Sequence, residues 1–171
     1  MEDDILFSEI QKFKQWWLWL IIVLVSVLPT LTILTLFAKQ PSAGEPAVSV
    51  GRLITAGCSI LPIILVLSFK LETQIKRDGV YARFFPLHLS FRKYTWDMIS
   101  ESYVRQYSPL GEYGGWGIRY GLGGAGKAFN ISGNKGLQLV FTNNKKLLIG
   151  TNNPEELTDA LKKLGQLKPH Q

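Results

Sequence analysis

The sequence predicts a membrane-embedded helical hairpin followed by an α+β domain, in which a curved antiparallel β-sheet carries one C-terminal helix. Three observations lead to this fold class. Two long apolar runs without a charged side chain lie in the first part of the chain. Short segments of alternating polarity, separated by turn residues, follow from residue 71 onward. The chain then ends in an amphipathic segment that has helix start and stop signals.

The two apolar runs cover residues 16–37 and 53–69, and neither contains Asp, Glu, Lys, Arg or His. A helix needs roughly 20 mostly apolar residues to cross a bilayer core of about 30 Å, and both runs come close to that length. The acidic start of the chain and the length of the first run argue against a cleaved signal peptide. We therefore expect a two-helix transmembrane hairpin at residues 16–70, between an N-terminal segment (1–15) and a separate domain (71–171).

Basic residues flank the two runs unevenly. The connection between the runs contains only Lys39 and Arg52, whereas Lys12, Lys14 and Lys70 lie on the other side. By the positive-inside rule, this distribution places the N- and C-termini in the cytoplasm. The sequence thus predicts a multi-pass protein of the inner (plasma) membrane with two spans. Because neither run carries an ionisable residue that an ion or proton pathway would need, the hairpin is interpreted as an anchor.

The domain after the hairpin is predicted to consist of short strands. Each segment mixes β-branched or aromatic residues with polar ones and is bounded by Gly, Pro, Asn or Asp. The expected strands are 71–77, 80–85, 91–96, 101–107, 116–120, 127–132, 137–142 and 145–149. Asp78-Gly79 and Asn143-Asn144 have the composition of two-residue hairpin turns.

The end of the chain predicts an amphipathic helix. Asn153 is a suitable N-cap, Pro154 suits the first helical position, and Glu156 stands where a capping box requires an acid. Gly165 offers a stop in the left-handed conformation. The apolar residues share one face at helical spacing: Leu157, Ala160, Leu161 and Leu164. This face is expected to cover one end of the curved sheet.

Two stretches carry a family resemblance. YSPLGEYGGWGIR (residues 107–119) and KAFNISGNKG (residues 127–136) are similar to small bacterial two-span membrane proteins with a C-terminal PH-like domain of unknown function. The resemblance covers most of residues 71–164. It implies a PH-like curved antiparallel β-barrel of about seven strands, capped by a C-terminal helix, and does not imply a reaction. The terminal helix lacks the tryptophan usual in eukaryotic PH domains, so inositide recognition is not implied.

Composition argues against several classes of function. The net charge of +6 and the pI near 9.5 come from dispersed basic residues, which argues against nucleic-acid binding. Cys58 is the only cysteine, so no disulfide framework or CxxC metal pair exists, and a reducing compartment is expected. His88 and His170 are the only histidines, and no catalytic grouping accompanies them. We therefore expect a protein that is not an enzyme and has no cofactor or metal.

Four basic residues near the end of the hairpin are candidate lipid-contact residues: Lys70, Lys76, Arg77 and Arg83. A cation held near an anionic leaflet contributes on the order of 1 kcal/mol to binding. The alternative interpretation is that these residues serve only topology and solubility.

Three residues around the glycine-rich turn are candidate partner-contact residues: Tyr113, Trp116 and Arg119. The glycines at 114, 115 and 117 allow close backbone approach around one large ring. The structural alternative is that Trp116 anchors the sheet and that Arg119 pairs with a nearby carboxylate or carbonyl.

The segment from Gly121 to Lys127 matches the P-loop spacing GxxxxGK, but it lacks the context of a phosphate site. Ala128 stands where a P-loop has Ser or Thr, so the hydroxyl that would hold Mg²⁺ is missing. A strand rather than a helix is expected to follow. A hairpin loop is the favoured interpretation.

These observations predict a non-enzymatic integral membrane protein whose cytoplasmic PH-like domain mediates contact with a protein partner or with anionic lipid headgroups at the membrane surface. The first alternative is an accessory subunit of a larger membrane complex, into which the hairpin packs. The second is a nucleotide-dependent enzyme that uses the 121–127 loop.

Overall fold

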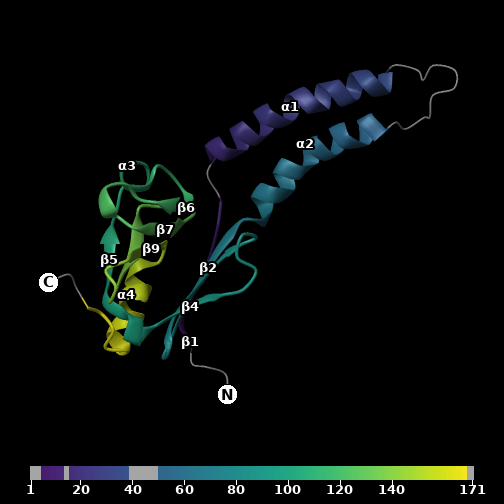
Figure 1. Cartoon of the computed structure of the whole chain (residues 1–171). Coiled ribbons are helices and arrows are strands. Elements are labelled where there is room, and N and C mark those ends of the chain that lie inside the picture. Colours follow the sequence, from purple (N-terminus) through teal and green to yellow (C-terminus); the bar gives the residue numbers. More distant parts are fainter. Residues whose placement is uncertain (1–4, 14–15, 39–49, 169–171) are drawn as a thin grey trace. The chain divides into compact units, whose positions relative to one another are not determined.

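The computed structural model describes residues 5–13, 16–38 and 50–168. The chain divides into two compact units (Figure 1). The sheet unit consists of residues 1–12 and 69–171, and the hairpin unit consists of residues 13–68. Lys14, Lys39 and His170, which the sequence-based predictions use, lie outside the described residues.

The first sheet of the sheet unit is a four-stranded antiparallel meander with the order β1-β2-β3-β4. Its strands are β1 (Ile5–Lys12), β2 (Lys70–Lys76), β3 (Gly79–Phe85) and β4 (Arg92–Thr95). The strands β2 to β4 were predicted, whereas β1 was not. It falls within the segment expected to precede the hairpin, and it pairs with β2 from Ile5 opposite Lys76 to Lys12 opposite Lys70.

The second sheet has five strands in the order β5-β8-β9-β7-β6. They are β5 (Ile99–Gln106), β6 (Gly117–Tyr120), β7 (Lys127–Asn130), β8 (Lys135–Phe141) and β9 (Lys146–Gly150). Neighbours pair antiparallel except β7 and β9, which are parallel. Three short helices interrupt the strands: η1 (Trp96–Met98), α3 (Pro109–Tyr113) and η2 (Leu122–Gly124).

The predicted PH-like curved antiparallel β-barrel of about seven strands is wrong, because the described strands form two separate sheets. The chain changes sheet at η1, between β4 and β5. There the indole Nε1 of Trp96 donates to the carbonyl oxygen of Lys76 at 3.1 Å, which holds the turn against the end of β2. Because β5 then pairs with β8 and not with β4, the two sheets do not continue into each other.

Two turns differ from their predicted form. Lys76 pairs with Gly79, so the β2–β3 turn is Arg77-Asp78, one residue earlier than the Asp-Gly pattern indicates. A Cβ atom on Gly79 would collide with the carbonyl oxygen of Tyr94 in β4, and this explains the glycine. In the β8–β9 connection, Asn144 has a φ of 62° but Asn143 does not share this conformation, and the amide of Phe141 donates to the carbonyl of Lys145. The connection is therefore longer than the predicted two-residue turn.

The core of the sheet unit lies where the inward faces of both sheets meet α4 (Pro154–Lys163). Ring contacts connect the two sheets, with His88 5.2 Å from Phe129 and Tyr94 5.6 Å from Phe141 between ring centroids. The largest fully buried side chains come from both sheets and from α4: Phe7, Leu71, Ile75, Phe84, Phe129, Ile131, Leu137, Leu139, Leu148, Ile149, Leu157 and Leu161.

The predicted C-terminal helix is confirmed. Leu157, Ala160 and Leu161 are buried, as their spacing indicates. Gly165 has a φ of 64° and donates to the carbonyl of Lys162, while the next amide donates to the carbonyl of Leu161, which is a Schellman motif. The start differs in detail, because the N-cap residue at position 153 makes no side-chain capping bond.

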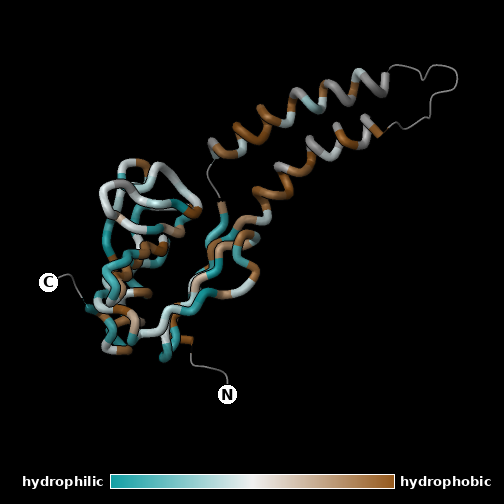
Figure 2. The backbone as a smooth tube through the Cα atoms, viewed as in Figure 1, coloured by the Kyte–Doolittle hydropathy of each residue, from teal (hydrophilic) through white to brown (hydrophobic). Residues whose placement is uncertain are grey.

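The hairpin unit contains α1 (Trp16–Ala38) and α2 (Val50–Ser68), which contact each other along their length and are rich in apolar residues (Figure 2). The predictions of a transmembrane hairpin and of a two-span location in the inner membrane are nevertheless wrong. Among the described residues, no helix combines the length and apolar character required to cross a bilayer. Ser26, Pro29 and Thr30 interrupt the apolar run of α1, and Gly57 interrupts that of α2.

Candidate functional site

The four candidate lipid-contact residues do not form one group. Glu72 binds two of them, with its Oε1 2.6 Å from Lys70 Nζ and its Oε2 2.5 Å from Arg83 Nη2. The Arg83 guanidinium also lies 4.6 Å from the centroid of the Phe91 ring. This pairing neutralises part of the positive charge at that end of β2.

Lys76 and Arg77 lie at the opposite end of β2, about 20 Å away at the usual rise of a strand. The Nζ atom of Lys76 lies 4.9 Å from the centroid of the Tyr81 ring. Arg77 is exposed in the turn. Lipid contact by these residues therefore stays a prediction, and the structure presents them as two separate pairs.

The candidate partner-contact residues occupy different environments. Tyr113 is buried, donates from its hydroxyl to the carbonyl oxygen of Ala125 at 3.1 Å, and packs edge-on against Tyr107. Trp116 is half-buried, and its indole Nε1 donates to the carbonyl oxygen of Gly133 at 3.4 Å. Arg119 is exposed and donates from Nε to the carbonyl oxygen of Trp116 at 2.9 Å. Tyr113 is thus a core residue. Arg119 pairs with a backbone carbonyl, as expected if its role is structural.

The YSPLGEYGG stretch forms α3 because its residues satisfy both helix ends. Ser108 is the N-cap, and its Oγ accepts from the amide of Gly111 at 3.1 Å. The carboxylate of Glu112 accepts from the amide of Ser108 at 2.8 Å, and Gly114 ends the helix with a φ of 66°. A bidentate pair then holds α3 against β5, with Arg105 Nη1 and Nη2 3.2 and 2.7 Å from the oxygens of Glu112.

We expect Glu112→Gln to lower the free energy of unfolding by about 1 kcal/mol, since the ion pair is partly exposed. The hydrogen bond from Arg105 lowers the pKa of Glu112, and burial of the carboxyl raises it. The hydrogen bond has the larger effect, so the pKa lies below its ordinary value of 4.5. The loss should therefore be present above pH 4.5 and disappear in more acidic solution. Urea unfolding of wild type, both single variants and the Arg105→Ala/Glu112→Gln double variant measures the coupling, and additive effects would contradict it.

The 121–127 segment forms a hairpin loop between β6 and β7, as predicted. The amide of Gly121 donates to the carbonyl of Gly126 at 2.6 Å, which closes the loop. Lys127 begins strand β7, and its Nζ lies 5.0 Å from the ring centroid of Phe129. No helix N-terminus follows this loop among residues 121–131, so the geometry of a P-loop phosphate site is missing there.

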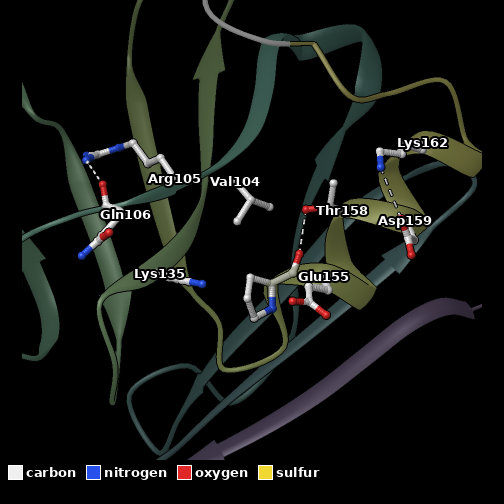
Figure 3. A pocket seen from close by; sticks show the side chains of 9 residues that line it. Val104, Arg105, Gln106, Lys135, Glu155, Thr158, Asp159 and Lys162 are labelled. Atoms are coloured by element: carbon white, nitrogen blue, oxygen red, sulfur yellow. Dashed lines mark hydrogen bonds and ion pairs between the residues drawn. The ribbon is translucent and has the colours of Figure 1, made fainter.

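A polar hollow of the sheet unit lies between β5 and α4 (Figure 3). Its volume is about 500 Å³, which is within the roughly 300–1,000 Å³ range of ligand sites. We call it the β5–α4 groove. Its lining residues are Val104, Arg105, Gln106, Lys135, Pro154, Glu155, Thr158, Asp159 and Lys162.

The strand side of the groove is an open sheet edge, because β5 is the first strand of its sheet. The backbone of Ser102 faces away from β8, since its N–H donates to the carbonyl of Lys168 at 3.0 Å and its carbonyl accepts from the amide of Lys168 at 2.9 Å. Backbone groups alternate along a strand, so those of Val104 and Gln106 face the same outer side. Within the described part of the chain, no backbone partner occupies that side at Val104.

The walls of the groove carry charges of both signs. Lys135 begins β8 on one side, and Glu155 lies in the first turn of α4 on the other (Figure 3). Lys162 and Asp159 form an exposed pair at 3.5 Å. The Thr158 hydroxyl donates to the carbonyl oxygen of Pro154 at 2.6 Å and so is held on the helix.

The groove was not predicted from the sequence. Val104 and Gln106 lie in a predicted strand, but nothing in their local pattern indicates that the strand is an edge. The signal that was available is the helical stripe Glu155, Thr158, Asp159 and Lys162, which shares one polar face of the predicted helix.

Comparison with family models, with curated proteins and with solved structures finds no match for this chain. The resemblance to bacterial proteins with PH-like domains therefore stays a prediction. Across residues 5–13, 16–38 and 50–168, no three His, Cys, Asp or Glu side chains come together in a metal-binding arrangement.

Proposed function

We propose that the protein is a non-enzymatic binding protein that takes up an extended segment of a protein partner as an added strand along β5. The observation that carries this proposal is the coincidence of an open strand edge with a groove of about 500 Å³. Strand addition is a general mode of peptide recognition, in which backbone bonds supply affinity and flanking side chains supply specificity.

The backbone of β5 supports this proposal at atomic detail. Among the described residues, no backbone group bonds the N–H or carbonyl of Val104 or the N–H of Gln106 on the outer side, so an added strand can form ladder bonds with them. Each such bond contributes about 0.5–1.5 kcal/mol net. The carbonyl of Gln106 already accepts from Arg105 Nη1, although only at 3.3 Å.

The chain itself already uses the neighbouring part of this edge. Lys168 pairs with Ser102 as an isolated antiparallel bridge, and the hydroxyl of Ser102 donates to the carbonyl oxygen of Gln166. This segment shows that the β5 edge accepts a further backbone. It also limits the added strand to the part of β5 that borders α4, at residues 104–106.

A proline substitution tests the proposal, because Val104→Pro removes the outward N–H and leaves the bonds from β5 to β8 in place. The probe is a random peptide library displayed on phage and selected against the full chain. We expect selected peptides to bind Val104→Pro at least about tenfold more weakly, which corresponds to one lost ladder bond of about 1.4 kcal/mol.

Val104→Ala is the matched control, since it keeps the N–H and should bind the same peptides within about threefold, a difference below 1 kcal/mol. Thermal unfolding of both variants establishes that they fold. Equal binding to Val104→Pro and Val104→Ala, or a library that yields no binder to the wild-type chain, would contradict strand addition at β5.

A further inference from the structure

A second hollow lies on the hairpin unit. It has a volume of about 390 Å³ and is almost entirely apolar. Its lining residues recur every three or four positions along one face of α1, with one residue from α2: Trp19, Ile22, Val23, Ser26, Val27, Thr30, Leu31 and Ile63. This spacing gives a continuous stripe over more than three helical turns. We call this surface the α1 stripe.

The hairpin exposes more apolar surface than a typical monomeric protein does. Many large apolar side chains of α1 and α2 are exposed, from 42% for Trp19 to 73% for Leu24. Each such side chain presents on the order of 100 Å², so the exposed apolar surface summed over all sides of both helices exceeds the roughly 300–600 Å² of the largest patch on a typical monomer. The two helices together, rather than the stripe alone, expose enough apolar area for the roughly 800 Å² per partner of a stable interface.

The stripe has the properties of a self-complementary surface. It carries no charged residue among its lining side chains, so nothing in it repels an identical surface. Two antiparallel helices with an apolar face form half of a four-helix bundle. At the centre of the stripe, Ser26 is small enough to permit close helix approach. Its Oγ is buried and finds no hydrogen-bond partner among the described residues.

We propose that the α1 stripe binds the α1 stripe of a second copy of this chain, so that two hairpins form a four-helix bundle with the two-fold axis near Ser26. A residue on the axis of a symmetric dimer meets its own copy. Rotation of each Ser26 side chain about χ1 then gives both hydroxyls a partner across the axis.

Disulfide cross-linking of the full chain tests this arrangement. In a Cys58→Ser background, which removes the only native cysteine, Ser26→Cys should form a covalent dimer on mild oxidation. Leu24→Cys is the matched control. It lies two residues away, about 200° around the helix, and is 73% exposed, so it should remain monomeric on a denaturing gel.

Light scattering of the unmodified chain gives the second measurement, and the expected mass is twice that of one 19.2 kDa chain. A cross-link at position 24 but not at 26 would overturn the proposed face. A monomeric mass without a cross-link would overturn self-association. A monomer that binds uncharged phosphatidylcholine vesicles would show that lipid covers the stripe, and a monomer that co-purifies with one other protein would show a different partner.

Discussion

Replacing Glu9 with alanine should lower the free energy of unfolding by about 3 kcal/mol, because two hydrogen bonds to a buried carboxylate are lost. Oε2 of Glu9 accepts from the hydroxyl of Thr151 at 2.6 Å, and Oε1 accepts from the amide of Asn152 at 2.8 Å. Thr151 is only 3% exposed, so its hydroxyl would lose a partner that water replaces poorly.

These bonds join β1 to the connection between β9 and α4, across more than 140 positions of the chain. Gln11 strengthens the same junction, since its Nε2 donates to the carbonyl of Gly150 at 2.6 Å. We therefore expect Glu9→Ala to release β1 selectively, with faster hydrogen exchange in β1 and β2 than in β8. Urea unfolding measures the free energy, and the matched control is Ser8→Ala at an exposed position of the same strand. A loss below about 1 kcal/mol would contradict this role for Glu9.

Replacing Glu72 with glutamine should lower the free energy of unfolding by about 2 kcal/mol. The substitution keeps the shape of the side chain but leaves Lys70 and Arg83 without their shared counter-charge. The side chain of Glu72 is only 8% exposed, whereas its two partners are 33% and 25% exposed, so the loss is smaller than for a fully buried pair.

The effect of Glu72→Gln should depend on pH. Burial raises the pKa of Glu72, but the hydrogen bonds and charges of Lys70 and Arg83 outweigh it and hold the pKa below its ordinary value of 4.5. A carboxyl with a lowered pKa in the folded state contributes stability above 4.5 and loses that contribution as the pH falls through the folded value. The difference between wild type and variant should thus be full near neutral pH and shrink in acid.

Urea unfolding at a series of pH values measures this difference. Asp97→Asn, at an exposed position in η1, is the matched control, because it removes a carboxylate without breaking a buried pair. A difference between wild type and Glu72→Gln that stays constant down to strongly acidic pH would contradict the assigned role of Glu72.

The two proposals concern different units and can fail independently. Strand addition depends on the edge of β5 and is tested by peptide binding to Val104→Pro. Self-association depends on α1 and is tested by cross-linking at Ser26. If both proposals hold, the dimer presents two β5–α4 grooves. A partner with two linked extended segments would then bind the dimer with higher affinity than a partner with one segment.

Strand β1 shows why part of the fold escaped prediction. Its inward residues are Phe7, Glu9 and Gln11, of which two are polar. Alternation of apolar and polar residues is the sequence signal of a half-buried strand, and this strand buries carboxylate and amide groups instead. Their burial is possible only because Thr151, Asn152 and the carbonyl of residue 150 supply partners from the far end of the chain.

Tyr113 and Trp116 show the corresponding limit for the candidate site. Both were chosen as aromatic residues beside a glycine-rich turn, but Tyr113 is enclosed by Tyr107 and Ala125 and is 2% exposed. An aromatic residue in a glycine-rich segment is compatible with either a recognition surface or a core. Burial depends on which segment folds over it, and a local pattern does not contain that information.

The sequence by itself determined the positions of β2 to β9, the hairpin of helices and the extent of α4, because turn residues, caps and hydrophobic spacing act over a few neighbouring positions. Only the tertiary structure decided that the strands form two sheets, that β1 joins the first of them and that β5 is an edge beside α4. The prediction of two membrane spans was also wrong, because no described helix is long and apolar enough to cross a bilayer. Strand pairing depends on residues far apart in the chain, so the edge on which the proposed function rests becomes visible only after folding.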